Sequence, residues 1–483
     1  WATVSVTVTS SVEWAQAHRE KLQGQPMTVP KHLEQLFSTD DGAIDPENLS
    51  SLDMPSTPRV RAAMLNDTLG RLQAFFPDDR LLDVDRLNQS LARELRSLSL
   101  KDMGRLRRKY QVRQIPPLPG LTHFEAAVDN SVQSLERVRF YSGQGEEDLA
   151  VSAEEYQRLL GQVRWLDFTR PLSQINVNRQ SPDQDEAQLR DALQSFTGLR
   201  IRQRLDDTLE IPPMPETAQK VLHLRMNPNA EVGDLADIVE NDPSLAAQVV
   251  SWASSSFYAS QTPVNSIYDA IMRVLGFDLV MNLAMGLSLG RTLKQPQDQP
   301  EGFIGYWTQA IWMAQATSVV ISMMPRRERP TYGLCYLAGL LHNFGYLVLA
   351  HVFPPHFSLI CRYTEVNRHV AEEFVEHHLI GITREQIGGI LMDLWNMPEE
   401  VVTAIRHQKN PDYQGEHAAY ANALFLARAH LVERGIPLGP RLEVPDELYQ
   451  RLNIPRERLS EEMDTLLENA DAVASMAGML STG

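Results

Sequence analysis

The apolar residues of this chain change their spacing from the first third to the rest, and this change limits the folds open to it. Before about residue 166, apolar residues such as Val60, Ala62 and Met64 recur at every second position, which predicts short strands, and a helical stretch follows from Asp85 to Tyr110. Beyond about residue 196, helix-period segments separated by short loops continue to the end. The sequence therefore predicts a multidomain protein with an α+β domain followed by an all-α domain.

The stretch between these blocks contains Pro171, Pro182 and four Asn or Gln residues between 174 and 180. Such a composition without a clear apolar period favours a linker. In the first residues, Trp1–Val8 alternates as an edge strand does. We therefore predict a segment 1–58 that belongs to the first domain, an α+β domain 59–166, a linker 167–195, an all-α domain 196–410 and a helical extension 411–483 packed on it.

Charge and cysteine content exclude several classes of protein. Lys and Arg number 45 against 62 Asp and Glu, so the net charge is −17, which weighs against DNA and anionic membranes as partners. Two cysteines exclude a disulfide framework and fit a reducing compartment. The longest apolar stretch, Leu334–Phe353, is interrupted by polar residues such as His342, so we expect no membrane span and a cytoplasmic protein.

Residues 93–113 are the one strongly basic stretch, with eight Lys or Arg residues against Glu94 and Asp102. Such a stretch could contact the phosphate backbone of tRNA. The alternative is the charged outer face of an amphipathic helix. We favour the second interpretation because Tyr110 alone offers a ring for base stacking.

Five stretches of the C-terminal half carry a recognisable pattern. They are IPPMPETAQKVLHL (211–224), LADIVENDPSLAAQVVSWASSSFY (235–258), SIYDAIMRVLG (266–276), YLAGLLHNFGYLVL (336–349) and LWNMPEEVVTAIRHQ (394–408). Together they resemble the HDOD domain, a signal-output relative of the HD metal-dependent phosphohydrolases. The resemblance implies an all-α fold in which a helical layer packs on a degenerate HD-type bundle.

The same resemblance implies where an HD-type metal site would lie. In HD enzymes, His and Asp side chains hold a divalent metal that acidifies a bound water. Most of the matching side chains here are not metal ligands, and an arginine among would-be ligands repels a dication. We therefore expect neither a metal nor a cofactor. The matching positions are Gln309, His342, Asn343, Arg384, His407 and Gln408, and the terminal Asp position falls on Ala427 or Arg428.

A second set of metal-type residues is spaced for one helix face. His369, Glu373 and His377 lie four residues apart, as ligands on a helix would. No fourth ligand is visible in the sequence, so we favour a solvated polar face.

Four stretches of the N-terminal block carry a second pattern. They are RVRAAMLNDTLGRLQAFFPDDRLLDVDRLNQSL (59–91), VRQIPPLPGL (112–121), AVDNSV (127–132) and FYSGQGEEDLAVSAEEYQRLL (140–160). Through them residues 59–165 resemble the YbaK/prolyl-tRNA deacylase-like family, whose members hydrolyse mischarged aminoacyl-tRNA. The family's lysine falls on Arg59 or Arg61, and Arg is not an equivalent of Lys because it presents a planar fork, so we do not expect catalysis here. The resemblance implies a candidate deacylase-like pocket of Arg59, Arg61, Arg113, Gln114, Ile115, Pro116 and Pro117.

Together these features predict a non-catalytic signal-transduction protein. We expect the HDOD-like block to bind a protein partner or a second copy of the chain, although the sequence does not identify that partner. Two alternatives stay open. One is an aminoacyl-tRNA deacylase that uses the N-terminal domain, and the other is a metal-dependent phosphohydrolase.

Overall fold

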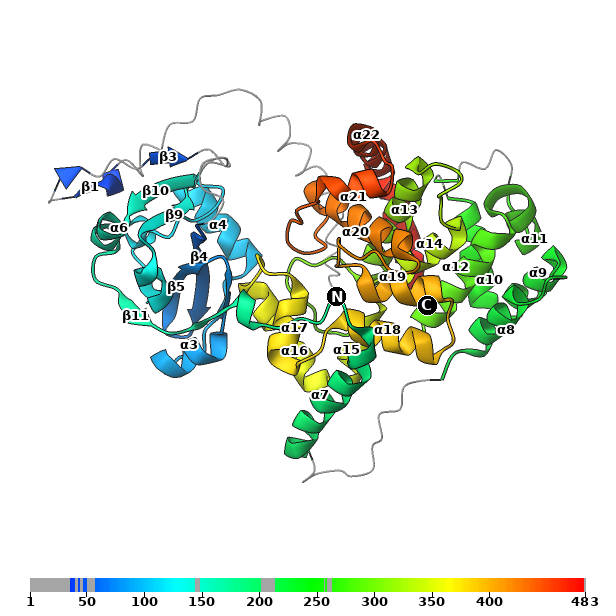
Figure 1. The fold of residues 1–483 in the computed structure, drawn as a ribbon, viewed down its shortest axis with the longest axis horizontal. Coiled ribbons are helices and arrows are strands. Elements are labelled where there is room, and N and C mark those ends of the chain that lie inside the picture. The colour runs from blue at the N-terminus through cyan, green and yellow to red at the C-terminus, as the bar shows by residue number, and fades with distance from the viewer. Residues whose placement is uncertain are drawn as a thin grey trace, which may run out of the picture.

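The structure is a computed structural model, and it describes residues 35–39, 42–43, 47–49, 57–143, 148–200, 213–255, 257–258 and 263–481. It contains an α/β unit, blue to cyan in Figure 1, and a helical unit, green to red. The strand predicted at Trp1–Val8, and most of the segment predicted at 1–58, lie outside the described residues.

The α/β unit is built on a mixed sheet with the strand order β11-β8-β5-β4-β9-β10-β3. Its central hairpin pairs Val60 with Pro77 and Asp67 with Gly70. Two further strands flank the other edge of β4, β9 in parallel at its start and β7 antiparallel at its end. The strands are β3 (Glu47–Leu49), β4 (Arg59–Asp67), β5 (Gly70–Pro77), β7 (Arg96–Ser97), β8 (Glu125–Asp129), β9 (Arg137–Tyr141), β10 (Asp148–Ser152) and β11 (Arg164–Leu166).

Helices α3 (Val84–Leu91), α4 (Leu100–Tyr110), α5 (Pro119–Thr122) and α6 (Ala153–Leu160) pack around this sheet. Its core contains Phe75, Val128, Phe140 and Tyr156, all of which are buried. Two short strand pairs accompany the main sheet, β1 (Ser38–Thr39) with β2 (Gly42–Ala43) and β6 (Arg80–Leu82) with β12 (Thr169–Pro171).

The single helical stretch expected from Asp85 to Tyr110 is wrong, because the structure divides it into α3, β7 and α4. Helix α3 ends where Ala92 adopts a left-handed φ of 51°, and the side chain of Asn88 then accepts the Leu95 amide at 2.9 Å. Helix α4 begins anew at Ser99, whose hydroxyl accepts the Asp102 amide at 3.1 Å. Local side-chain caps therefore interrupt a helical pattern.

The rest of the described chain is helical, as the sequence predicted. A π-helix (Ala270–Leu275) follows α11. The helices are α7 (Asp185–Arg200), α8 (Glu216–Arg225), α9 (Val232–Glu240), α10 (Pro243–Ala253), α11 (Ile267–Asp269), α12 (Phe277–Gly290), α13 (Tyr306–Met323), α14 (Tyr332–Leu341), α15 (Phe344–Val352), α16 (Pro354–Val366), α17 (Glu372–Ile380), α18 (Arg384–Leu394), α19 (Glu399–His407), α20 (Ala418–Glu433), α21 (Asp446–Arg451), α22 (Arg456–Leu467) and α23 (Ala470–Ser481).

Helix α13 lies in the core of the helical unit and packs against α14 and α20. The closest approach is at Gly339 of α14, where a Cβ atom would lie 2.5 Å from the Cα of Ala314. Only glycine permits two helix backbones to come so near. This packing holds the loop that follows α14 in a fixed position.

One stretch, Tyr332–Val352, has the length and mean hydropathy of a membrane-crossing helix, but 89% of it is buried inside the helical unit. It is also two helices, because α14 ends before His342 and α15 begins after Asn343. The core packing of a helical domain accounts for its apolar composition.

The two units are joined through the end of α16 and the loop that follows it, coloured yellow in Figure 1. The side chain of Asn367 accepts the Leu82 amide at 2.7 Å and donates to the Leu82 carbonyl at 2.9 Å. Tyr363 donates from its hydroxyl to Asp83 at 3.0 Å, and His369 Nε2 donates to the Arg80 carbonyl at 3.0 Å. This contact is therefore specific and hydrogen-bonded.

The stretch 167–195, predicted as a linker, forms specific hydrogen bonds where it meets the helical unit. Arg406 Nη2 donates to Asp185 Oδ1 at 2.8 Å and to the Asn178 carbonyl at 2.9 Å, and Gln386 donates to the same Asp185 oxygen at 2.8 Å. Asp185 is 3% exposed. Of the polar residues that suggested a linker, Asn178 therefore contacts α19 through its carbonyl, and Asp185 bonds to both α18 and α19, whereas Gln174, Asn176 and Gln180 are exposed.

Candidate functional site

The His342-Asn343 pair lies in the short break between α14 and α15, in the interior of the helical unit. Helices α13, α17, α18 and α20 and the end of α19 bring polar side chains to this point. The residues that line the small cavity there are Phe303, Gln309, His342, Asn343, Glu372, Arg384, Glu385, Gln408, Lys409, Arg428 and Leu438.

A chain of amide hydrogen bonds runs through the site. Asn343 donates from Nδ2 to Gln309 Oε1 at 3.0 Å, and its Oδ1 accepts from Arg384 Nη1 at 3.2 Å. Gln408 donates to the His342 carbonyl at 2.6 Å. Both functional groups of Asn343 are thus engaged by the protein.

The imidazole of His342 is held in one tautomer. Its Nδ1 lies 2.8 Å from the Gly339 carbonyl, so this nitrogen carries the proton and donates it. Burial, and to a lesser degree the nearby Arg428 and Arg384, lower the pKa of His342 to about 3. The imidazole is therefore neutral at physiological pH.

Three carboxylates and three cations are paired inside the site. Lys409 Nζ lies 3.0 Å from Glu372 and 2.9 Å from Glu385, and Arg428 lies 2.8 Å from Glu372. Arg384 forms an ion pair with Glu376. The formal charges of this group, which we call the ion network, therefore sum to zero.

The pKa values reflect this pairing. Burial would raise the pKa of Glu372, but Arg428 and Lys409 outweigh it and hold that pKa well below its usual range. Burial would likewise lower the pKa of Lys409, yet Glu372 and Glu385 raise it. Glu372 and Lys409 therefore remain ionised at neutral pH, whereas burial raises the pKa of Glu376 to about 7 despite its ion pair with Arg384.

The site does not fit the metal that an HD-type enzyme would hold. Its cavity measures about 20 Å³, room for about one water molecule. The carboxylates are already neutralised by Lys and Arg, and a dication would be repelled by those cations. Within the residues described, no group of three or more His, Cys, Asp or Glu side chains could hold a metal ion. We therefore derive no metal-dependent step.

Most of the HD-type positions inferred from the sequence come together here. Gln309, Asn343 and Arg384 line the cavity, as do His342 and Gln408. Of the two residues proposed for the terminal Asp position, Arg428 lines the cavity and Ala427 is buried in the apolar core.

His407 does not belong to this group. Its Nδ1 donates to the Arg179 carbonyl at 3.2 Å, and its ring stacks on Tyr413 with 3.8 Å between the ring centroids. Burial and Arg406 lower its pKa to about 4. His407 is therefore engaged by the segment before α7 and not by the cavity.

The set His369, Glu373 and His377 does not share one helix face. Helix α17 begins at Glu372, so His369 lies before it and faces the α/β unit through its bond to Arg80. Glu373 forms an ion pair with Arg179. These side chains have separate partners.

The sequence analysis missed Glu372, Glu376, Glu385 and Lys409 as members of the site. The sequence analysis predicts a solvated polar face for the neighbouring set His369, Glu373 and His377, and this is wrong at Glu373, which is 3% exposed. The sequence did contain one signal, a group of carboxylates between positions 372 and 385. If such a group is buried, it needs cations nearby, and this could have indicated Lys409 as a partner.

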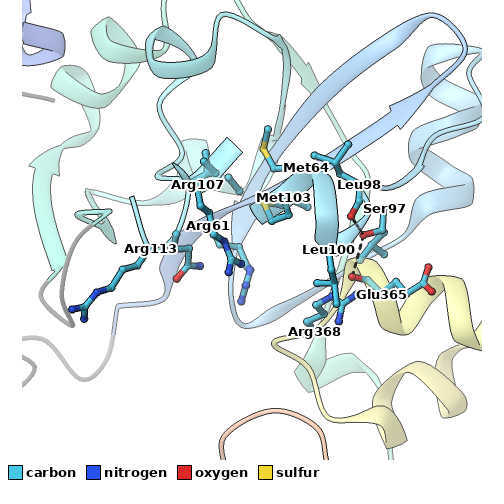
Figure 2. Close-up of a pocket in the computed structure, with 15 residues that line it drawn as sticks. Arg61, Met64, Ser97, Leu98, Leu100, Met103, Arg107, Arg113, Glu365 and Arg368 are labelled. Carbon is cyan, nitrogen blue, oxygen red and sulfur yellow. Dashed lines mark hydrogen bonds between the residues drawn. The ribbon is translucent and has the colours of Figure 1, made fainter. Parts of the chain in front are cut away.

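The candidate deacylase-like pocket is only partly brought together. Arg61, Arg113, Gln114 and Ile115 line a cavity of about 300 Å³ beside β4, shown in Figure 2. Arg59 instead pairs with Asp148 at 2.8 Å and does not line it. Pro116 and Pro117 are buried in the α/β unit and do not line it either.

The basic stretch 93–113 divides between ion pairs and this cavity. Arg93 binds Asp67 at 2.6 Å and Glu125 at 2.7 Å, whereas Arg107 and Arg113 line the cavity. The stretch therefore does not form a single charged helix face.

Comparison with known proteins adds to this geometry. Residues 211–411 match the model of the HDOD domain. The crystal structure of a protein from Marinobacter aquaeolei VT8, provisionally named a signal transduction protein, has a TM-score of 0.87. The two sequences are 49% identical, over 94% of this chain and 100% of that chain.

Two further proteins are more distant. An HDOD domain protein of unknown function from Geobacter sulfurreducens is 20% identical over 61% of this chain and 97% of that chain, with a TM-score of 0.46. An uncharacterized protein of Treponema pallidum (strain Nichols) is 24% identical over 219 residues, which is 44% of this chain. The chain spans 39% of the length of that relative.

Proposed function

Because residues 211–411 of this chain are an HDOD domain, we propose that it is a signal-transduction protein that acts by binding a protein partner and not by catalysis. The observation that carries the proposal is the ion network. It surrounds the residues that the resemblance to HD enzymes assigns to the metal site, and its paired charges and its cavity of about 20 Å³ favour neither a dication nor a substrate there.

The ion network has a structural role that suits a binding domain. Glu372 of α17 is tied to Lys409 after α19 and to Arg428 of α20, and Arg384 ties α17 to α18. Buried pairs of this kind penalise any rearrangement that separates one partner. The network therefore holds the helices of the bundle in one arrangement, which a partner can recognise as a rigid surface.

Catalysis and binding are tested separately. We expect the full-length chain, supplied with Mg²⁺, Mn²⁺, Fe²⁺ or Zn²⁺, to release no phosphate from a panel of phosphomonoesters and phosphodiesters. Metal-dependent turnover that is abolished in Asn343→Ala would contradict the proposal.

For binding, we expect affinity capture from native cells to yield a partner that forms a stable complex with this chain from purified components. Self-association would also satisfy the proposal if it is saturable in analytical ultracentrifugation. If neither a heterologous complex nor self-association can be reconstituted, the proposal of a binding function fails.

The deacylase function implied by the resemblance of residues 59–165 stays a prediction from the sequence. One observation favours this function, because Arg61 and Gln114 line the same cavity. Its lining has Arg where that family uses Lys, so we place it second.

A further inference from the structure

The cavity of about 300 Å³ in Figure 2 lies where the α/β unit meets the helical unit. One wall is the edge of β4. Strand β9 pairs with Arg59–Val60 and β7 pairs with Leu65–Asn66, so residues 61–63 have no strand partner on that edge within the described chain. The other walls are α4, the loop 113–115 and, from the helical unit, Glu365–Arg368.

Four arginines and one acid line this cavity. Arg61 and Arg368 are half-buried, and Arg107 and Arg113 are exposed at its rim, with Arg113 extending away from the others in Figure 2. The acid, Glu365, is already engaged. It pairs with Arg362 at 3.1 Å and accepts the Glu301 amide at 2.8 Å. A local positive charge therefore collects here in a chain whose net charge is −17.

Within the described residues, Glu365 and Glu301 attract Arg368 and Asp78 attracts Arg61, but only across distances too long for a hydrogen bond or an ion pair. Among the residues that the structure describes, none of Arg61, Arg107, Arg113 and Arg368 donates a side-chain hydrogen bond or forms an ion pair, and Nη2 of Arg368 is buried without any acceptor. Arg93, by contrast, is satisfied by two carboxylates. A buried donor without an acceptor is costly, so the unpaired Nη2 of Arg368, together with three further arginines around the same cavity, points to an external acceptor.

The electrostatics agree with this interpretation. Burial lowers the pKa of Arg61 to about 10, and burial followed by repulsion from Arg368 lowers the pKa of Arg107. All of these groups remain charged at neutral pH. An anion with several oxygens would relieve both the desolvation and the mutual repulsion, and the planar fork of arginine matches phosphate oxygens.

The remaining lining is apolar and includes Ala62, Met64, Leu98 and Met103. A volume of about 300 Å³ is at the lower end for small-molecule sites. We propose that the cavity binds a small phosphorylated molecule of the nucleotide class, with its phosphate oxygens held between Arg61 of the α/β unit and Arg368 of the helical unit. The ligand would thereby bridge the two units.

This position gives the ligand a route to the HDOD domain. Arg368 lies between α16 and α17, four residues before Glu372 of the ion network. The inference goes beyond the proposed function because it assigns an input to the domain. It would stand even if the binding partner of the HDOD domain were never found.

The experiment uses the full-length chain and a fluorescent N-methylanthraniloyl-ADP probe, with inorganic pyrophosphate as competitor, at fixed ionic strength. We expect saturable binding that pyrophosphate displaces. Each charged hydrogen bond lost should weaken binding roughly 10-fold or more, so Arg61→Ala and Arg368→Ala should both show this loss.

The matched control is Arg108→Ala, because Arg108 is exposed on the same helix as Arg107 and does not line the cavity. Its affinity should stay within about two-fold of the wild type. If Arg368→Ala fails to fold by circular dichroism, Arg107→Ala at the rim replaces it and should weaken binding while the fold persists.

Three outcomes would overturn the proposal of a phosphate site, and a fourth would overturn its assignment to nucleotides. The first three are the absence of saturable binding of either probe at about 1 mM, an equal loss in Arg108→Ala, and tight binding of a short RNA that is insensitive to Arg368→Ala. The last outcome would assign the basic stretch to RNA instead. Binding of pyrophosphate without the nucleotide probe would also overturn the nucleotide class.

Discussion

Replacing Lys409 with Met tests whether the ion network stabilises the helical unit as its geometry indicates. The ammonium lies 3.0 Å from Glu372 and 2.9 Å from Glu385, and its side chain is 9% exposed. After Lys409→Met, Glu372 keeps Arg428, but the Glu385 carboxylate loses its cation. The charge of the network changes from zero to −1, and the cost of a buried charge without its partner is about 3–5 kcal/mol.

The measurement is the free energy of unfolding in urea, followed by far-ultraviolet circular dichroism and by tryptophan fluorescence so that non-coincident transitions are recognised. We expect Lys409→Met to lower the free energy of unfolding by about 3–5 kcal/mol. A second substitution, Glu385→Gln, restores neutrality and should recover most of that loss. A double-mutant cycle then gives the coupling energy of the pair.

The control is the exposed pair Lys220–Glu216, which has a shorter distance of 2.7 Å but side chains that are 50% and 78% exposed. Lys220→Met should change stability by less than about 0.5 kcal/mol, because water screens the pair. If Lys409→Met were as harmless as this control, or if Glu385→Gln made it worse, the reasoning from burial would be refuted.

Four further outcomes follow from the structure. The pKa of His342 is 6.5 in the unfolded chain and about 3 in the folded protein, so the unfolded chain binds the proton more readily. The stability contributed by the neutral imidazole should therefore be complete above about pH 6.5 and fall as the pH drops toward 3. Acid unfolding curves of His342→Gln should show a smaller decline. Neither the wild type nor Asn343→Asp should bind stoichiometric Mn, Fe or Zn, because the new carboxylate would pair with Arg384 of the ion network. Elemental analysis measures the metal, and one equivalent in the wild type would contradict this prediction. Asn367→Ala leaves the Leu82 amide and carbonyl unpaired, so the contact between the units should weaken by about 1–3 kcal/mol and limited proteolysis between them should accelerate. The wild type should release amino acids from mischarged aminoacyl-tRNAs no faster than background, and turnover that disappears in Arg61→Ala would make the α/β unit an editing enzyme.

Part of the site could be predicted from the sequence, because each matching stretch fixes where its residues lie along a helix. His342-Asn343 could be placed from the apolar run around it, and Gln309, Arg384 and Gln408 followed from their neighbours. The sequence predicts both His407 and Gln408 at the site, and only Gln408 lines the cavity. A step of one residue turns a side chain by about 100° around a helix, so its neighbour faces the cavity while His407 faces Arg179.

Burial of charge could not be predicted in the same way. Glu372 and Glu376 lie in the run EEFVEHH, which the sequence alone presents as a polar helix. Whether such a face is solvated depends on which helices cover it, and that is set by contacts between residues distant in the chain. Lys409 illustrates this, because its partners precede it by 37 and 24 positions.

The contact of Asp185 with Arg406 determines where the helical unit can be cut from the rest of the chain. The family model spans residues 211–411, but the buried carboxylate that neutralises Arg406 comes from residue 185, upstream of that span. A fragment that starts at residue 196 would keep the guanidinium and lose its counter-charge. A gene fusion or deletion that cuts at residue 211 would therefore leave Arg406 buried without its carboxylate. We expect a stable helical unit only where residues 178–185 are retained with it.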